Sequence, residues 1–216
     1  MEMTILRQSA MSGESHSVIF LLHGYGANAD DLMGLARPLA TPFPDCEFVA
    51  PNAPESCPGL PNGRRWFPIP WMDGADEETV ESSLQASTEI LAQMVESELQ
   101  RLNLREESAI LFGFSQGTMI ALHYAVRHVR CFAGVIGFSG RLLAPERLHS
   151  ETVSRPPVLL VHGDADPVVP FACLREAGAA LETAEFSVRT HVSPGTAHSI
   201  APDGLEQAVL FARTLL

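Results

Sequence analysis

A serine lies between two glycines at residues 113–117, in the order Gly-Phe-Ser-Gln-Gly. A short apolar run with β character precedes this segment, and residues with helical spacing follow it over 118–125. A strand, a sharp turn and a helix form the context in which G-x-S-x-G presents a nucleophilic serine. Gly113 and Gly117 leave space where side chains two residues to either side of the serine would collide. Ser115 is therefore the candidate nucleophile.

A serine hydroxyl becomes reactive when a base accepts its proton, and the base is usually a histidine that a carboxylate orients. For a serine in this context the partners follow in the order serine, acid, histidine. Residues 162–170 follow a buried apolar run and offer Asp164 and Asp166 as the acid. His198 lies beyond this loop, in a glycine-containing loop after a predicted strand. The candidate set is therefore Ser115, one of two aspartates, and His198.

The tetrahedral intermediate of acyl transfer needs backbone N–H donors around its negatively charged oxygen. The N–H of Gln116, next to the candidate nucleophile, is one such donor. The glycine-rich loop at residues 23–28 is expected to supply the other, because Gly24 and Gly26 let its backbone come close to a substrate. Within this loop the N–H of Tyr25 is the best candidate.

Three other histidines have structural interpretations. His191 falls inside a predicted strand, and His23 and His162 each precede a glycine at a strand end, where an imidazole bonds to loop backbone. Asp164 and Asp166, without a histidine at suitable spacing, are weak evidence for a metal site. We therefore expect neither a metal nor a cofactor.

The candidate residues lie at the ends of strands in a chain whose strands alternate with helices. Expected strands cover residues 3–7, 17–22, 47–50, 109–112, 132–138, 157–162 and 186–192. Expected helices cover residues 30–40, capped by Asp30 or Asp31, and residues 76–102, 118–125, 171–184 and 205–216. This alternation predicts an α/β fold with a mainly parallel central sheet and helices on both faces. At 216 residues, we expect a single domain over 1–216.

Residues 51–75 differ in composition from the rest of the chain. Six prolines make a long helix or strand unfavourable there, yet the segment also carries large apolar side chains, which argue against disorder. Two compatible interpretations follow: the loop covers the core, or it forms a wall or lid of an apolar pocket. In the second interpretation Trp66 and Phe67 are the candidate substrate-binding side chains.

The net charge of −12 disfavours nucleic acids and anionic membranes as partners, because both attract basic surfaces. No apolar stretch reaches the length of about 18 residues typical of a membrane-spanning helix, and no signal peptide is visible. The cysteines are widely spaced and are expected to be reduced thiols; they are Cys46, Cys57, Cys131 and Cys173. These features predict a cytoplasmic protein without stable membrane insertion.

Four motifs together resemble the carboxylesterase/phospholipase family of α/β-hydrolases, which includes the acyl-protein thioesterases. They lie at residues 22–26, 113–117, 162–170 and 195–199. The motifs follow the order found in the family, and the likeness covers nearly the whole chain. The combination is far more specific than any one motif, and it implies an α/β-hydrolase fold.

This resemblance also implies a role for each candidate residue. The implied roles are Ser115 as nucleophile, Asp166 as acid, His198 as base, and the N–H groups of Tyr25 and Gln116 as the oxyanion hole. An independent reason favours Asp166 over Asp164, because Pro167 biases the residue before it toward an extended backbone and so holds its side chain in one direction. Asp164 is expected to bond nearby backbone N–H groups instead.

The activity implied by the resemblance is that of a serine hydrolase. It would cleave carboxylic esters or thioesters with short to medium acyl chains through an acyl-enzyme, with a lysophospholipase or an acyl-protein thioesterase as alternatives. The implied partners are a small acyl ester or thioester, with a lysophospholipid as a further candidate, and the chain would be a monomer or a homodimer. One departure affects the pocket: the family often has Trp-Phe/Tyr-Asp in the long loop, whereas Trp66 and Phe67 continue into Pro68.

A dinucleotide-dependent oxidoreductase is a remote alternative. Gly24, Gly26 and Ala29 match the fingerprint G-x-G-x-x-G/A after a predicted strand. A dinucleotide site also needs an acidic residue at the end of the second strand to hold the ribose, and the strand that ends at Pro51 ends in apolar residues. A protein that only binds a ligand is a second rival, but it would not need serine, aspartate and histidine together.

Overall fold

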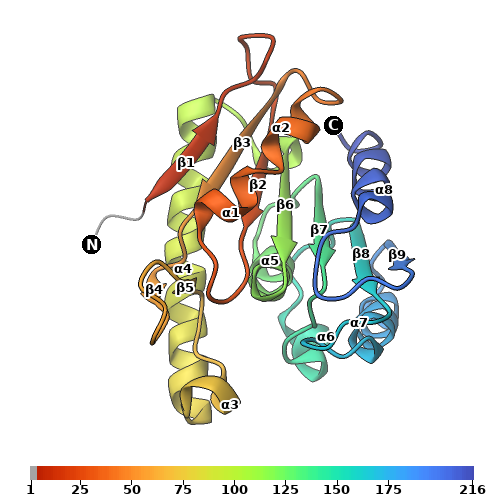
Figure 1. Ribbon diagram of the computed structural model, residues 1–216. Helices are drawn as coiled ribbons and strands as arrows, with labels where there is room; N and C mark the ends of the chain where they lie inside the picture. The colour runs from red at the N-terminus through yellow and green to blue at the C-terminus, as the bar shows by residue number, and fades with distance from the viewer. Residues whose placement is uncertain (1–3) are drawn as a thin grey trace.

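The computed structural model describes residues 4–216 and contains a seven-stranded sheet in the order β1-β3-β2-β6-β7-β8-β9 (Figure 1). Its strands are β1 (Ile5–Gln8), β2 (Ser17–Leu22), β3 (Cys46–Pro51), β6 (Ala109–Phe114), β7 (Gly134–Phe138), β8 (Val158–Gly163) and β9 (Val188–Ser193). β1 pairs antiparallel with β3, and the other pairs are parallel. The predicted mainly parallel sheet is thus confirmed. The first residue of the expected strand at residues 3–7 lies outside the described residues.

Helices cover both faces of the sheet (Figure 1). One face carries α4 (Glu77–Leu102), α5 (Gln116–Arg127), α6 (Leu148–Glu151) and α7 (Ala172–Thr183). The other face carries α1 (Ala29–Met33), α2 (Ala36–Ala40) and α8 (Pro202–Ala212). Two 3₁₀ turns, η1 (Glu106–Ser108) and η2 (Pro145–Arg147), precede β6 and α6. All six residues of β2 are buried, as expected for a parallel strand covered on both faces.

The long helix α4 begins and ends where the sequence predicts. The Asp76 side chain accepts a hydrogen bond from the Thr79 N–H at 2.8 Å, which satisfies a donor that the first turn would otherwise leave free. At the other end Asn103 adopts the left-handed conformation, with a φ of 53°. Other predicted elements are present with shifted ends; α8, for example, ends at Ala212 rather than at residue 216.

The helix expected over residues 30–40 is wrong in two respects. The capping residue is Asn28, whose side chain accepts the Asp30 N–H at 2.9 Å, while the Asp31 side chain accepts the Asn28 N–H at 2.9 Å. The helix also stops after Met33 and resumes as α2. Pro38 explains the break, because it has no N–H for the carbonyl four residues earlier and its ring crowds that carbonyl.

The loop expected at residues 51–75 contains more regular structure than its prolines predict. β4 (Glu55–Ser56) and β5 (Arg64–Arg65) form a short antiparallel hairpin, and α3 (Pro70–Asp73) is a single helical turn. The turn begins with Pro70, at a position where the N–H would have no acceptor within the helix. Figure 1 shows β4, β5 and α3 together beside α4.

The carboxyl ends of the parallel strands meet at one edge of the sheet, and the candidate residues follow them. Leu22 pairs with Gly113, and Gly163 pairs with Ser193. At the turn after β6, a Cβ atom on Gly117 would lie 2.5 Å from the Leu22 carbonyl carbon, and one on Gly113 would lie 2.5 Å from the Gly117 oxygen. The collision predicted for side chains at these two glycines is therefore confirmed.

This close approach predicts the effect of adding a methyl group. Gly117→Ala should lower the free energy of unfolding by about 3 kcal/mol or more, because backbone on both sides of the contact leaves little room to relax. Gly34→Ala is the matched control, since its Cβ would meet only the Asp31 oxygen at 3.6 Å. The control should be neutral or stabilise by about 0.4–1 kcal/mol. Urea denaturation measures both, and equal stability of the two variants would contradict the prediction.

Candidate active site

Ser115 has a backbone conformation that residues other than glycine rarely adopt, with a φ of 53° and a ψ of −116°. Its N–H donates to the Phe138 oxygen of the neighbouring strand at 2.8 Å. The Thr118 hydroxyl lies 2.8 Å from both the Phe138 and the Gly113 carbonyl oxygens. The turn between β6 and α5 is therefore held to β7, which keeps the serine in its strained conformation at the start of the helix.

Asp166 and His198 are joined by a hydrogen bond of 2.7 Å from Nδ1 to Oδ2. The Asp166 side chain is fully buried, and its Oδ1 accepts the N–H groups of Val168 and Val169 at 2.8 and 2.9 Å. Burial alone would raise the pKa of this carboxyl, but the hydrogen bonds from His198 and from the two N–H groups outweigh it and hold the pKa below its ordinary value. An ionised carboxylate only accepts, so it selects the tautomer with a proton on Nδ1 and leaves Nε2 as a base.

Asp164 has a different role, as expected. Its side chain accepts the Gly195 N–H at 2.6 Å and so ties the acid loop to the loop that carries His198. The two loops touch backbone to backbone, because a Cβ atom on Gly163 would overlap the Thr196 carbonyl. The geometry supports Asp166 as the acid and gives Asp164 a part in loop structure.

The ring of His198 packs on Phe114, with the ring centroids 4.8 Å apart. Phe114 directly precedes Ser115, so this contact brings the candidate base to the turn that carries the candidate nucleophile. Among the hydrogen bonds of residues 4–216, none joins the Ser115 hydroxyl to His198. Such bonds are often long in a free enzyme and tighten when substrate binds.

The candidate oxyanion donors are available. Within the described part of the chain, the N–H groups of Tyr25 and Gln116 have no acceptor, whereas the Gly26 N–H donates to the Arg64 oxygen at 2.9 Å. The loop that carries Tyr25 also lies against the nucleophile, because a Cβ atom on Gly24 would come within 3.2 Å of the Ser115 Cβ. Two unused donors thus flank the serine from two different loops, as an oxyanion hole requires.

The Gln116 side chain makes contacts that sequence reasoning missed. It is fully buried; its Oε1 accepts the Trp66 N–H at 2.9 Å, and its Nε2 donates to the Phe67 oxygen at 2.7 Å. The Trp66 indole N–H donates to the His23 oxygen at 2.9 Å, and the Ser87 hydroxyl bonds the Trp66 oxygen. These bonds hold the long loop against the turn after β6. The sequence has no pattern that links residues about 50 positions apart, so it could not indicate this clamp, by which we mean the hydrogen bonds from Gln116 to the backbone of Trp66 and Phe67.

The structure places Trp66 and Phe67 in the core cluster beneath the site. Trp66 has no exposed surface, so its side chain does not reach a substrate in this arrangement, and the expectation that it lines the pocket is corrected. The reason is the clamp just described, which turns the indole inward against His23. In this part of the loop the interpretation as a cover for the core is favoured. Leu60, Trp71 and Met72 are the large apolar side chains that the loop exposes.

A pocket of about 300 Å³ opens beside His198. Its lining is mainly apolar and comes from the loop after β2, from the α1–α2 segment and from the His198 loop; it includes Gly24, Ala27, Leu32, Leu35, Phe114 and Ile200. The pocket contains the candidate base and borders the glycine-rich loop at residues 23–28, here called the oxyanion loop, and is therefore the candidate site for an acyl chain. The residues that line it from α1 and α2 carry no motif that would have identified them.

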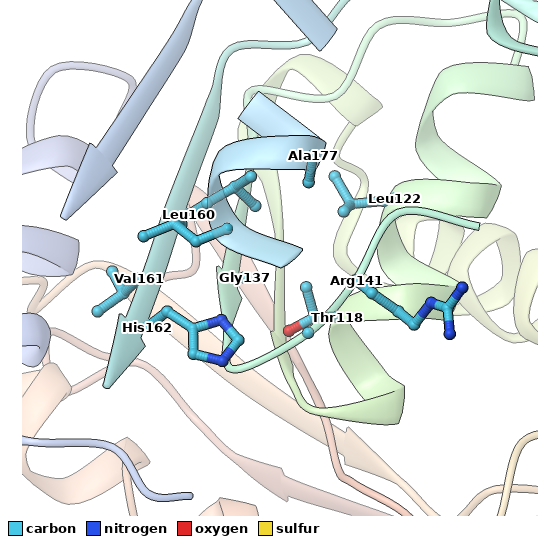
Figure 2. Close-up of a pocket in the computed structure, with 10 residues that line it drawn as sticks. Thr118, Leu122, Gly137, Arg141, Leu160, Val161, His162 and Ala177 are labelled. Atoms are coloured by element: carbon cyan, nitrogen blue, oxygen red, sulfur yellow. The ribbon is translucent and has the colours of Figure 1, made fainter. Parts of the chain in front are cut away.

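A second cavity, of about 10 Å³, lies beside His162 (Figure 2). Figure 2 shows His162 projecting from β8 toward Thr118 of α5. The cavity has room for about one water molecule and not for a substrate. His162 lies 3.0 Å from the Val169 oxygen and 3.3 Å from Asp166 Oδ2, which confirms its interpretation as a loop-bonding histidine.

Residues 4–216 contain neither a metal-binding cluster nor a membrane-spanning helix. No cluster of three or more histidine, cysteine, aspartate or glutamate side chains in this part of the chain is arranged to hold a metal ion. No helix within the same residues has the length and apolar character needed to cross a membrane.

Both the sequence and the structure of this chain are similar to those of known proteins. The profile of the phospholipase/carboxylesterase family matches residues 7–216. Acyl-protein thioesterase 1 of Saccharomyces cerevisiae is 29% identical over 227 residues, with 98% of each chain covered. Esterase YpfH of Escherichia coli is 27% identical over 187 residues, which covers 86% of this chain and 77% of that protein. The crystal structure of esterase PE8 superimposes with a TM-score of 0.93 at 38% identity and covers 100% of both chains.

These similarities confirm the predicted α/β-hydrolase fold. None of the three relatives is named as an oxidoreductase, so the dinucleotide alternative gains no support.

The free energy of unfolding is expected to depend on pH because of His23, the first residue of the oxyanion loop. His23 donates from Nδ1 to the Gly24 oxygen at 2.7 Å, and its Nε2 accepts the Ala53 N–H at 2.9 Å, so the neutral ring uses both nitrogens. Burial lowers the pKa of His23 to about 4. An unfolded chain binds this proton near pH 6.5, so His23 by itself should lower the free energy of unfolding by roughly 2 kcal/mol between pH 7 and pH 5.

Urea denaturation at the two pH values measures this loss. The His23→Gln variant should be less stable at pH 7 and should lose part of the pH dependence. A second part should remain, because burial also lowers the pKa of His123 to about 4. The same pH dependence in wild type and in His23→Gln would refute the assignment.

Proposed function

The chain belongs to the phospholipase/carboxylesterase family and is a hydrolase of carboxylic esters or thioesters, and we propose that Ser115, Asp166 and His198 perform this reaction through an acyl-enzyme. The observation that carries the proposal is the hydrogen bond of 2.7 Å from His198 to the buried Asp166. It lies at the same edge of the sheet as the strained turn that carries Ser115.

The proposed mechanism has two half-reactions. In the first, the Ser115 oxygen attacks the acyl carbon while Nε2 of His198 accepts the hydroxyl proton, and Asp166 stabilises the imidazolium. The negative oxygen of the intermediate accepts the N–H groups of Tyr25 and Gln116. The alcohol or thiol then leaves with the proton from His198. In the second half-reaction, water attacks the acyl-enzyme, His198 accepts its proton and returns it to Ser115, and the carboxylic acid leaves.

The pocket supports a short to medium acyl chain. Its volume of about 300 Å³ is at the small end for ligand pockets, and Leu32, Leu35 and Ile200 give it an apolar wall. A lysophospholipid or an acylated protein is the finer alternative for the natural substrate. A panel of oxygen esters and thioesters of graded chain length, with a lysophospholipid included, separates these alternatives.

Other features of the chain remain part of the proposal. The seven-stranded sheet, which includes both β1 and β9, supports one domain over residues 1–216. All four cysteines are free thiols, which supports a reducing compartment such as the cytoplasm. We propose a monomer or a homodimer, and sedimentation equilibrium distinguishes the two.

Covalent labelling tests the nucleophile. A fluorophosphonate probe should react with wild-type protein at one site, because only an activated serine attacks it. Mass spectrometry should locate the adduct on the peptide that contains Ser115, and Ser115→Ala should abolish both labelling and ester hydrolysis. An adduct on another serine of the folded protein would remove Ser115 from the mechanism.

The two neighbouring aspartates provide a matched pair of variants. Asp166→Asn should lower kcat by roughly 10³–10⁴-fold, because the amide no longer selects the tautomer that leaves Nε2 as the base. Asp164→Asn should cost little activity and act mainly on stability, since Asp164 bonds only backbone of the neighbouring loop. Both are measured with one short ester, and circular dichroism checks the fold. An active Asp166→Asn beside an inactive Asp164→Asn would reverse the assignment of the acid.

A further inference from the structure

The backbone N–H and the side chain of Tyr25 have different surroundings. Its N–H has no acceptor within the described residues and is the candidate oxyanion donor. Its phenol, in contrast, is anchored: the hydroxyl donates to Asp73 Oδ1 at 2.6 Å. The oxyanion loop is therefore attached through the side chain of the same residue whose backbone would contact the reacting oxygen.

Asp73 is itself held from several directions. Its side chain is only 5% exposed, its Oδ2 accepts the Ile69 N–H at 2.6 Å, and its Oδ1 lies 2.7 Å from Arg65 Nη1. Burial alone would raise the pKa of this carboxyl, but the hydrogen bonds from Tyr25 and Ile69 and the charge of Arg65 hold the pKa below its ordinary value. Asp73 is thus an ionised acceptor at neutral pH, and charge-assisted hydrogen bonds to it are short and strong.

Arg65 connects this carboxylate to the hairpin. Its Nε donates to Glu55 Oε2 at 2.9 Å, and the Ser83 hydroxyl on α4 bonds the other oxygen of Glu55. Arg65 Nη1 is buried, and Asp73 is the group that faces it. The chain of contacts therefore runs from α4 through Glu55, Arg65 and Asp73 to the Tyr25 hydroxyl.

The backbone of the loop is attached to the same hairpin next to these side chains. The Gly26 N–H donates to the Arg64 oxygen at 2.9 Å, and the Arg64 N–H donates to the Ala27 oxygen at 2.8 Å. Tyr25 is thus fixed on one side by the backbone of residue 64 and on the other by the side-chain network of residue 65. The Gly24 oxygen belongs to the same peptide unit as the Tyr25 N–H and accepts from His23 Nδ1 at 2.7 Å. Removal of the side-chain anchor would therefore loosen this peptide without releasing it.

We propose that Asp73 and Arg65 are positioning residues for the reaction, which aim the Tyr25 N–H at the substrate oxygen by holding the Tyr25 hydroxyl. This inference rests on the proposed oxyanion role of Tyr25. An oxyanion donor contributes about 10²–10³ in kcat, and it does so only when it is held within a few tenths of an ångström of its place. Residues that hold it are expected to affect kcat without touching the substrate.

Two variants and one control test the inference. Asp73→Asn and Tyr25→Phe should each lower kcat for a short ester by about 10- to 100-fold, a part of the effect of losing the donor altogether, with KM changed less than twofold. Both should weaken inhibition by a trifluoromethyl ketone by a similar factor, because its adduct carries the oxyanion. The double variant should be little worse than either single one, because both act on the same contact: Asp73→Asn removes the charge that strengthens it, and Tyr25→Phe removes the donor.

Glu98→Gln is the matched control. Glu98 is also a buried carboxylate with arginine partners, Arg7 and Arg101, but it lies toward the far end of α4 from α3. The control should lose stability and keep its kcat and its inhibitor affinity. If Asp73→Asn behaves like this control, Asp73 has a structural role only and the inference is overturned.

Two further outcomes need to be distinguished: an Asp73→Asn variant that does not fold, and failure of the proposed function itself. If Asp73→Asn does not fold, Tyr25→Phe decides alone, because it removes a single hydroxyl, and an unchanged kcat and inhibitor affinity in it overturn the inference. Failure of the proposed function looks different: Ser115→Ala would then keep its activity. An inactive Ser115→Ala together with fully active Asp73→Asn and Tyr25→Phe variants would refute this inference and leave the proposed mechanism intact.

Discussion

The contact between the end of β2 and the start of α5 is the constraint on which the rest of the site depends. Gly117 lies so close to the Leu22 carbonyl that no side chain fits between them. This approach forces the turn at Ser115 into a conformation that costs on the order of 1–3 kcal/mol for a residue with a Cβ. The hydrogen bonds from Ser115 and Thr118 to β7 offset that cost. The backbone has no room to relax at this contact, so Ser115 stays in its strained conformation at the edge of the sheet.

Around this turn the molecule is rigid on one side and open on the other. Gln116 bonds both Trp66 and Phe67, and Trp66 bonds the carbonyl of His23, so three segments are locked together behind the nucleophile. The open side, near Leu35 and His198, is an apolar pocket. A site with a fixed back and an apolar front suits a reaction in which the acyl carbon must be placed accurately while the chain attached to it varies.

Electrostatics act locally in this strongly acidic chain. Two buried carboxylates near the site, Asp73 and Asp166, are kept ionised by hydrogen bonds and by Arg65 or His198 respectively. Each therefore serves as a fixed acceptor: Asp166 for the imidazole, and Asp73 for the phenol of Tyr25. His23, in contrast, is held neutral because both of its nitrogens are already used and burial penalises the charged form.

The sequence by itself determined the order of strands and helices and the residues most suited to chemistry. Apolar periodicity and turn residues act over a few positions, so the strand, glycine-flanked serine and helix at residues 109–127 were predictable, as was the preference for Asp166 that Pro167 creates. The break between α1 and α2 was not predicted, although Pro38 accounts for it. Only the tertiary structure decided that Trp66 faces the core, that Gln116 clamps the long loop, and that Asp73 meets Tyr25. These contacts join residues about 50 positions apart through hydrogen bonds between single groups, and such bonds leave no periodic pattern in a sequence.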